Sequence, residues 1–175
     1  GAQRWPSAVP PLSWLAVADF VASGASAGLD DVIGVSSAQL LLLVNSGGTL
    51  RLQPRAFGVH TLRSLVKLVP GDLNGDRRID FVTVEAGGGS QVFLQTAAGA
   101  FVRSGLMPGG RPAADGALAD WNGDGFTDWI ALEARSRAVS LALGNGQGGF
   151  RAGPGTPLST ARPRGLVVLP DTTSG

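Results

Sequence analysis

Short apolar runs rich in Val, Leu, Ile and Phe recur along the chain, and turn-forming Gly, Asn and Ser residues separate them. Runs of this kind are typical of β-strands. No segment combines a helical period with helix caps. The segment 60–69, HTLRSLVKLV, has the composition of a helix, but the repeat described next makes its second half a strand. The pattern therefore predicts an all-β fold.

The same order of elements occurs three times. The segments GLDDVIGV (28–35), RIDFVTVE (78–85) and FTDWIALE (126–133) align without gaps, each with Asp in its third position, namely Asp30, Asp80 and Asp128. A polar or glycine turn, a second apolar run and another small turn follow each segment. An internal repeat of this length is a sign of stacked, similar units.

The spacing of the repeat is nearly constant. The residues that open the loops, Asp19, Asp72, Asp120 and Asp171, are 53, 48 and 51 positions apart. About four strands per 50 residues is typical of a β-propeller blade. A β-sandwich would have similar hairpins, but it does not explain a fixed period.

The repeat divides the chain into blades of one partial β-propeller covering residues 1–175. We expect blades at about 12–60, 61–109 and 110–160, and the start of a further blade at 165–175. Propellers typically close with four to eight blades. The sequence therefore predicts part of a larger propeller, completed by the rest of a longer chain or by self-association.

Two loops carry oxygen-bearing side chains in the same pattern. Numbered from its first Asp, each loop has Asp or Asn at positions 1, 3, 5 and 9, and the peptide oxygen of position 7 adds a fifth donor. Such a set of hard oxygens suits Ca²⁺ better than Mg²⁺, which demands near-octahedral geometry. The side-chain candidates are Asp72, Asn74, Asp76 and Asp80 in one loop and Asp120, Asn122, Asp124 and Asp128 in the other; the carbonyl candidates belong to Arg78 and Phe126.

These loops are not EF-hands. An EF-hand needs a bidentate Glu at position 12, where the two loops have Thr83 and Ala131. Catalysis by these carboxylates would need a cleft and two carboxylates in different environments. Because the acids occur in equivalent loops, metal ligation is the simpler role.

The motif D-x-N-G-D-x-x-x-D is followed by FVTV or WIAL and recurs about every 50 residues. This pattern resembles the FG-GAP/VCBS repeat family, the integrin-α-like calcium-binding β-propellers. The resemblance implies a calcium loop between the first two strands of a blade. It also implies that the Asp and Asn side chains at positions 1, 3, 5 and 9 of both loops are calcium ligands.

The loops differ in ways that predict different affinities. Position 6 turns sharply and favours Gly; Gly125 occupies it in the third repeat, but Arg77 occupies it in the second. A left-handed Arg77 costs on the order of 1 kcal/mol, so we expect the 120–128 site to be tighter than the 72–80 site. In the first repeat Asp19 and Asp30 are eleven positions apart, and we expect that blade to have lost its metal.

Composition narrows the possible functions. The 175 residues include no Cys, one His (His60) and scattered basic residues with a net charge of +1, so a thiolate site, a histidine-based triad and nucleic-acid binding are disfavoured. The longest apolar run, 38–44, is far too short to span a bilayer. No catalytic constellation is evident, and we expect this chain not to be an enzyme.

These observations lead to a functional prediction. We expect a binding module in which structural calcium supports loops that contact a protein or glycan, in an extracellular or periplasmic setting. The alternative is a non-catalytic part of a propeller enzyme such as a polysaccharide lyase or hydrolase. Of the aromatic residues near the third loop, Trp129 is expected to pack between blades. Trp121 points away from the metal site and could be exposed and stack on a sugar, but packing at the rim is the favoured role.

Overall fold

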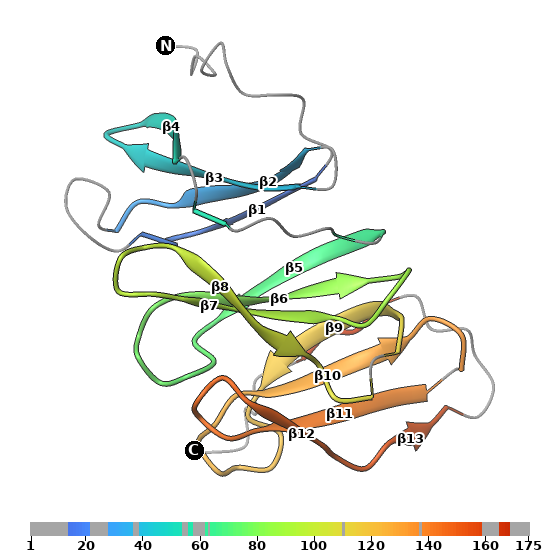
Figure 1. Cartoon of the computed structure of the whole chain (residues 1–175). Helices are drawn as coiled ribbons and strands as arrows, with labels where there is room; N and C mark the ends of the chain where they lie inside the picture. Colours follow the sequence, from blue (N-terminus) through green and yellow to red (C-terminus); the bar gives the residue numbers. More distant parts are fainter. Residues whose placement is uncertain are drawn as a thin grey trace.

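The structure is a computed structural model. It describes residues 14–21, 28–36, 39–53, 56–57, 62, 64–109, 111–136, 138–158 and 165–168. Three antiparallel sheets follow one another along the chain, each a meander of sequential strands (Figure 1). Because β1 to β12 each pair with a sequence neighbour inside their own sheet, each four-stranded sheet assembles from local contacts.

The first sheet has the strand order β1-β2-β3-β4. Its strands are β1 (Trp14–Ala18), β2 (Asp31–Ser36), β3 (Gln39–Ser46) and β4 (Thr49–Gln53). A two-glycine turn at Gly47 and Gly48, both with positive φ, joins β3 to β4. Glycine adopts this conformation without the Cβ clash that other residues suffer.

The second and third sheets repeat this arrangement. The second contains β5 (Leu65–Gly71), β6 (Asp80–Glu85), β7 (Gln91–Gln95) and β8 (Phe101–Leu106). The third contains β9 (Ala113–Ala119), β10 (Asp128–Glu133), β11 (Ala138–Gly144) and β12 (Phe150–Ala152), with a short β13 (Thr156–Pro157) also pairing with β11. The outer edge of the third sheet is thus made of two short strands instead of one.

The sheets pack side by side through their first strands. β1 contacts β5, and β5 in turn contacts β9. Figure 1 shows the three sheets stacked in chain order. Three four-stranded antiparallel meanders related in this way have the arrangement of propeller blades, so the predicted all-β fold and blade topology are confirmed.

The hydrophobic core consists of two layers, one between each pair of adjacent sheets. Phe81 and Phe93 of the second sheet pack with Ile33 and Leu42 of the first. From the opposite face of β6, Val82 and Val84 pack with the third sheet. Since successive side chains of a strand point to opposite faces, a strand buried on both sides carries an almost continuous apolar run.

The segment 60–69 behaves as the repeat predicted. β5 begins at Leu65, so the second half of the segment is a strand. His60 lies outside the described residues. Of the expected further blade, only 165–168 is described; it has no assigned strand, and Leu166 donates its N–H to Asp115 Oδ2 of β9 at 2.7 Å.

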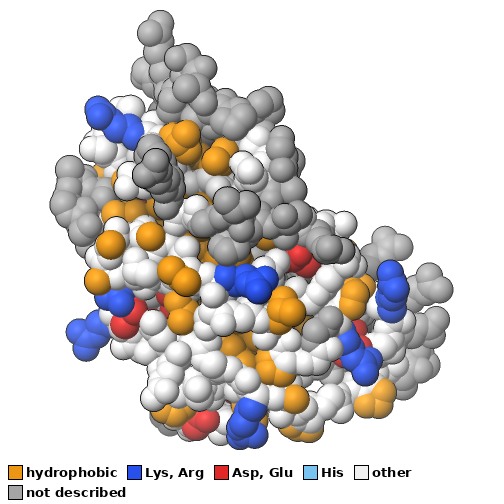
Figure 2. Space-filling view, in the orientation of Figure 1, with side chains coloured by type: hydrophobic (Ala, Val, Ile, Leu, Met, Phe, Trp, Pro, Cys, Tyr) orange, Lys and Arg blue, Asp and Glu red, His pale blue; other side chains and the backbone are white. Residues whose placement is uncertain are grey.

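The described residues contain no helix long and apolar enough to cross a membrane. Figure 2 shows Lys and Arg side chains dispersed over one face of the molecule, among small hydrophobic groups.

Candidate metal-binding loops

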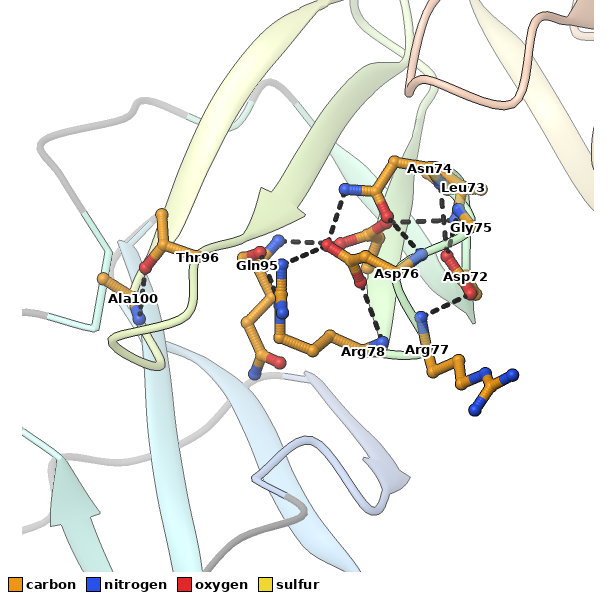
Figure 3. Close-up of polar contacts among 11 residues, drawn as sticks. Asp72, Leu73, Asn74, Gly75, Asp76, Arg77, Arg78, Gln95, Thr96 and Ala100 are labelled. Atoms are coloured by element: carbon orange, nitrogen blue, oxygen red, sulfur yellow. Dashed lines mark hydrogen bonds and ion pairs between the residues drawn. The ribbon is translucent and has the colours of Figure 1, made fainter.

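The loop between β5 and β6 is organised by its own side chains (Figure 3). Asp72 accepts hydrogen bonds from the N–H groups of Gly75 at 2.8 Å and Arg77 at 2.8 Å. Asn74 Oδ1 accepts from Asp76 N at 3.2 Å, and Asp76 Oδ1 accepts from Arg78 N at 2.9 Å. Each oxygen-bearing side chain therefore folds back over the turn, which brings positions 1, 3 and 5 to one side of the loop.

The loop between β9 and β10 has the same hydrogen bonds. Asp120 accepts from Gly123 N at 2.8 Å and from Gly125 N at 2.9 Å. Asn122 Oδ1 accepts from Asp124 N at 3.0 Å, and Asp124 Oδ1 accepts from Phe126 N at 2.9 Å. The side chains of Asp120, Asn122 and Asp124 therefore all hydrogen-bond to backbone N–H groups of the same turn.

The aspartate at position 9 of each loop faces the interior instead. Asp80 is fully buried, and its carboxylate accepts from Leu73 N at 3.0 Å and Gln95 N at 2.7 Å. Asp128 accepts from Trp121 N at 2.9 Å and Gly144 N at 2.8 Å. Each of these carboxylates ties the start of its loop to the end of the third strand of the blade.

Burial has an electrostatic consequence at Asp80. Desolvation raises the pKa of this carboxyl above its ordinary value of 3.8, although the N–H groups of Gln95 and Leu73 partly oppose the rise. The negative charges of Asp76 and Asp72 raise it further. A cation bound in this loop would relieve that repulsion, because an opposite charge nearby favours the ionised form.

The first repeat corrects the predicted register. Asp31, not Asp30, occupies the place of Asp80 and Asp128: it is fully buried and accepts from Val21 N and Asn45 N, both at 2.7 Å. Asp30 is exposed. The gap-free alignment is wrong by one residue, because two adjacent aspartates satisfied the pattern and the loop before them is longer. Much of that loop, 22–27, lies outside the described residues.

An arginine occupies part of the loop between β5 and β6. The Arg78 guanidinium forms an ion pair with Asp76 Oδ2, and its Nε donates to Gln95 O at 3.2 Å (Figure 3). Asn74 Nδ2 donates to the same Asp76 oxygen at 2.8 Å. The sequence pattern predicts only a carbonyl ligand from Arg78. The signal for this ion pair is a basic residue two positions after Asp76.

The loop between β9 and β10 has no such internal cation. Phe126 replaces Arg78, and Asp124 Oδ2 accepts a hydrogen bond from Asn122 Nδ2 at 2.8 Å. The turn geometry at position 6 is as predicted: Arg77 has a φ of 65° and Gly125 a φ of 84°. The Arg77 side chain points away from the loop (Figure 3).

Neither loop gathers three acidic side chains at one point. Among the residues that the structure describes, no group of three or more His, Cys, Asp or Glu side chains lies close enough to hold a metal ion. The donor chemistry nevertheless fits a hard cation, since each loop offers carboxylate and amide oxygens on one side of a tight turn. A bound cation would have to draw position 9 towards positions 1, 3 and 5.

The third sheet covers the loop of the second. Thr127 Oγ1 donates to Asp72 O at 3.1 Å, and Gly148 N donates to Leu73 O at 2.9 Å. Leu73 is only 3% exposed under this contact, whereas its equivalent Trp121 is 64% exposed. The described residues leave Trp121 exposed and do not give it the favoured packing at the rim. The expected packing of Trp129 between blades is confirmed, because Trp129 is 3% exposed.

Both loops lie in a part of the chain that matches a known protein family. The chain matches the family described as FG-GAP-like repeat, from the first ligand candidate of one loop, Asp72, to Ala131 beyond the last candidate of the other. Residues 72–131 form an FG-GAP-like repeat. No curated protein and no solved structure matched the chain.

The FG-GAP-like repeat contains both loops and most of the second core layer. It runs from Asp72 through β6, β7 and β8 into the middle of β10. FG-GAP-like repeats often bind Ca²⁺, and the resemblance stated from the sequence is confirmed for this part of the chain.

Proposed function

We propose that this chain is part of a calcium-stabilised β-propeller that acts as a binding module for a protein or glycan. The observation that carries the proposal is the loop between β9 and β10. There Asp120, Asn122 and Asp124 share one side of a turn that glycine makes possible, and no arginine occupies it. The match to FG-GAP-like repeats, many of which bind calcium, also supports a calcium site in this loop.

Calcium in this loop would be structural. Asp120, Asn122, Asp124 and Asp128 would supply side-chain oxygens, and Phe126 its carbonyl oxygen. The ion would neutralise adjacent carboxylates and fix the turn between the first two strands of the blade. A ligand that binds only the folded state stabilises it by mass action.

The loop between β5 and β6 would bind calcium more weakly. Asp72, Asn74, Asp76, Asp80 and the Arg78 carbonyl would hold the ion there. The Arg78 guanidinium would first have to leave Asp76 Oδ2, where it already supplies a positive charge. This competition adds to the left-handed strain at Arg77 that the sequence predicted.

Calorimetric titration with Ca²⁺ tests this ranking. We expect Asp124→Ala to remove the tighter binding event and Asp76→Ala to leave it unchanged. Arg78→Gln should strengthen the weaker event, because glutamine cannot pair with Asp76 as a cation. Loss of the tight event in Asp76→Ala, or no change in Arg78→Gln, would contradict the assignment.

We also propose that a further blade packs against the third sheet. The support comes from the repeat: Leu73 is covered by the next blade, and Trp121, in the same position, is exposed. The blade would come from the rest of a longer chain or from a second copy. An extracellular or periplasmic setting suits a structural calcium ion of micromolar to millimolar affinity.

A binding role is proposed in preference to a catalytic one. The acidic residues lie in equivalent loops and are engaged by backbone N–H groups, which is the arrangement of a structural element. The alternative role, a non-catalytic part of a polysaccharide lyase or hydrolase, would place the reacting groups in other blades. Activity of a longer chain on polysaccharides, absent from the binding module alone, would favour that alternative.

A further inference from the structure

A cavity of about 420 Å³ lies between the second and third sheets. Ser90, just before β7, and Met107, just after β8, line it from the second blade, and Trp129, Ala131 and Ala142 line it from the third sheet. β10 runs from Asp128, at the calcium loop, to Glu133, which lines the cavity. The cavity therefore belongs to the opposite end of the blade and is separate from the loops.

The internal repeat shows that small residues create this space. In the second sheet Phe93 pairs with Phe81, and the two rings stack with centroids 4.8 Å apart. In the third sheet Trp129 occupies the place of Phe81, but its partner is Ala142. A phenyl ring that fills one interface is thus replaced by a methyl group in the other.

At the neighbouring positions, too, the third sheet has smaller residues than the second. Between the first and second sheets, Thr83, Glu85 and Gln91 form a buried hydrogen-bonded network, and Arg103 donates to Gln91 Oε1 at 3.2 Å. The register of the strands places Ala131, Ser140 and Ala152 where the second sheet has Thr83, Gln91 and Arg103. Only Glu133, the equivalent of Glu85, is kept.

The cavity contains a polar group that needs a partner. Ser90 is 3% exposed, and its Oγ is buried without a hydrogen-bond partner among the described residues. A buried hydroxyl in this condition is uncommon and points to water or a ligand. Since Ser90 lines the cavity, a bound molecule there would meet this hydroxyl.

The remaining polar lining is balanced in charge. Arg111 Nη1 donates to Glu133 Oε2 at 3.2 Å, and the Ser136 hydroxyl donates to the same oxygen. The Glu133 side chain is only 8% exposed, whereas that of Arg111 is 66% exposed. The pair offers donors and acceptors with no net charge to attract an ion.

From this lining we propose that the cavity binds one ring of a neutral sugar. A pyranose has an apolar C–H face for the wall formed by Trp129 and Met107, and hydroxyls that both donate and accept for Ser90, Ser140 and the Arg111–Glu133 pair. A purely apolar ligand would leave Ser90 unsatisfied, and an ionic ligand would find its counter-charge already paired. The volume lies in the range of small-molecule sites.

The inference rests on the proposed binding role and narrows its ligand to a glycan, but it does not depend on calcium. Saturation-transfer NMR with free monosaccharides tests it on the whole chain. The probes are neutral hexoses and N-acetylhexosamines, with glucuronic acid and indole as the charged and apolar comparisons. We expect a saturable signal from at least one neutral sugar.

Two variants locate the binding. Ala142→Phe restores the residue found at the equivalent position of the second sheet, and it should abolish sugar binding while the melting temperature stays the same or rises, because the ring fills existing space. Ser90→Ala should weaken binding about tenfold by removing the hydroxyl partner. If Ala142→Phe does not fold, Ser140→Gln provides a second way to fill the cavity.

The proposal is wrong if no neutral sugar gives a saturable signal, if indole alone binds, or if binding survives in the filled variants. Each titration is repeated in Ca²⁺ and in EGTA. A calcium response without sugar binding would refute the cavity proposal and leave the calcium assignment standing. Sugar binding in both solutions without a calcium response would refute the calcium assignment and leave the cavity proposal standing.

Discussion

At the scale of single residues, one buried aspartate per blade connects two segments of that blade by hydrogen bonds. Asp31, Asp80 and Asp128 each accept two backbone N–H groups, one from the segment before the second strand and one from the end of the third strand. Burial raises the pKa of Asp31 and of Asp80, and the hydrogen bonds from backbone N–H groups oppose that rise. The motif therefore has a structural function even where no metal site is expected, as in the first blade.

Adjacent aspartates provide a matched test of this role. Asp31→Ala leaves the N–H groups of Val21 and Asn45 without their carboxylate partner, and we expect it to lower the free energy of unfolding by about 2 kcal/mol or more. Asp30→Ala changes an exposed side chain and should stay within about 0.5 kcal/mol of the wild type. Urea denaturation measures both. Equal losses would contradict the corrected register.

At the scale of the elements, the Trp129 ring in the second core layer packs closely against the backbone of β9. A Cβ added to Gly116 of β9 would lie 2.2 Å from Cη2 of Trp129. Gly116 therefore leaves the space that the Trp129 ring occupies beside the first strand of its own blade. No heavy atom lies within 4 Å of the corresponding Cβ at Gly105 in β8.

Alanine substitution separates these two glycines. Gly116→Ala forces the Trp129 ring to move, and we expect a loss of about 1–3 kcal/mol together with a shift in tryptophan fluorescence. Gly105→Ala should leave both nearly unchanged. Chemical denaturation followed by fluorescence measures the difference, and an unperturbed Gly116→Ala variant would refute the packing described.

An ion pair connects two first strands. Lys67 of β5 pairs with Asp115 of β9, which also accepts from the N–H groups of Leu166 and Gly116. Burial raises the pKa of Asp115, but these hydrogen bonds and the Lys67 charge outweigh it, so the pKa lies below the ordinary value of 3.8.

The sign of this shift gives a pH prediction. A carboxyl with a lowered pKa stabilises the folded state above pH 3.8 and loses that contribution as the pH falls through its folded pKa. Asp115→Asn should therefore be about 1 kcal/mol less stable than the wild type near neutral pH, and the difference should shrink below pH 3.8. A difference that stays constant on acidification would contradict the ion pair.

Much of this element-scale structure follows from sequence pattern. The period, the strand character of 65–69 and the positions of both loops rest on residue types with strong local preferences. The register of the first blade could not be predicted from the sequence. Asp30 and Asp31 fit the sequence pattern equally well, and only their burial in the structure distinguishes them. The Arg78–Asp76 pair and the cavity beside Ser90 depend on which side chains meet across sheets, which a single sequence does not record.

At the scale of the whole molecule, each blade depends on the next for cover. The third sheet buries Leu73 and hydrogen-bonds to the loop of the second, and no described residue gives Trp121 the same cover. Light scattering on the purified chain tests the proposal of a further blade. A concentration-dependent oligomer would support completion by a second copy, and a monomer would leave a longer chain as the source of the blade.

Thermal unfolding in Ca²⁺, in Mg²⁺ and in EGTA tests the central claim most directly. We predict that a hundredfold excess of calcium over its Kd raises the melting temperature by roughly 5–10 °C, that magnesium does not, and that Asp124→Ala abolishes the rise while Asp76→Ala reduces it little. Equal melting temperatures of the wild type in Ca²⁺ and in EGTA would contradict the claim, and the two loops would then be hydrogen-bonded turns alone.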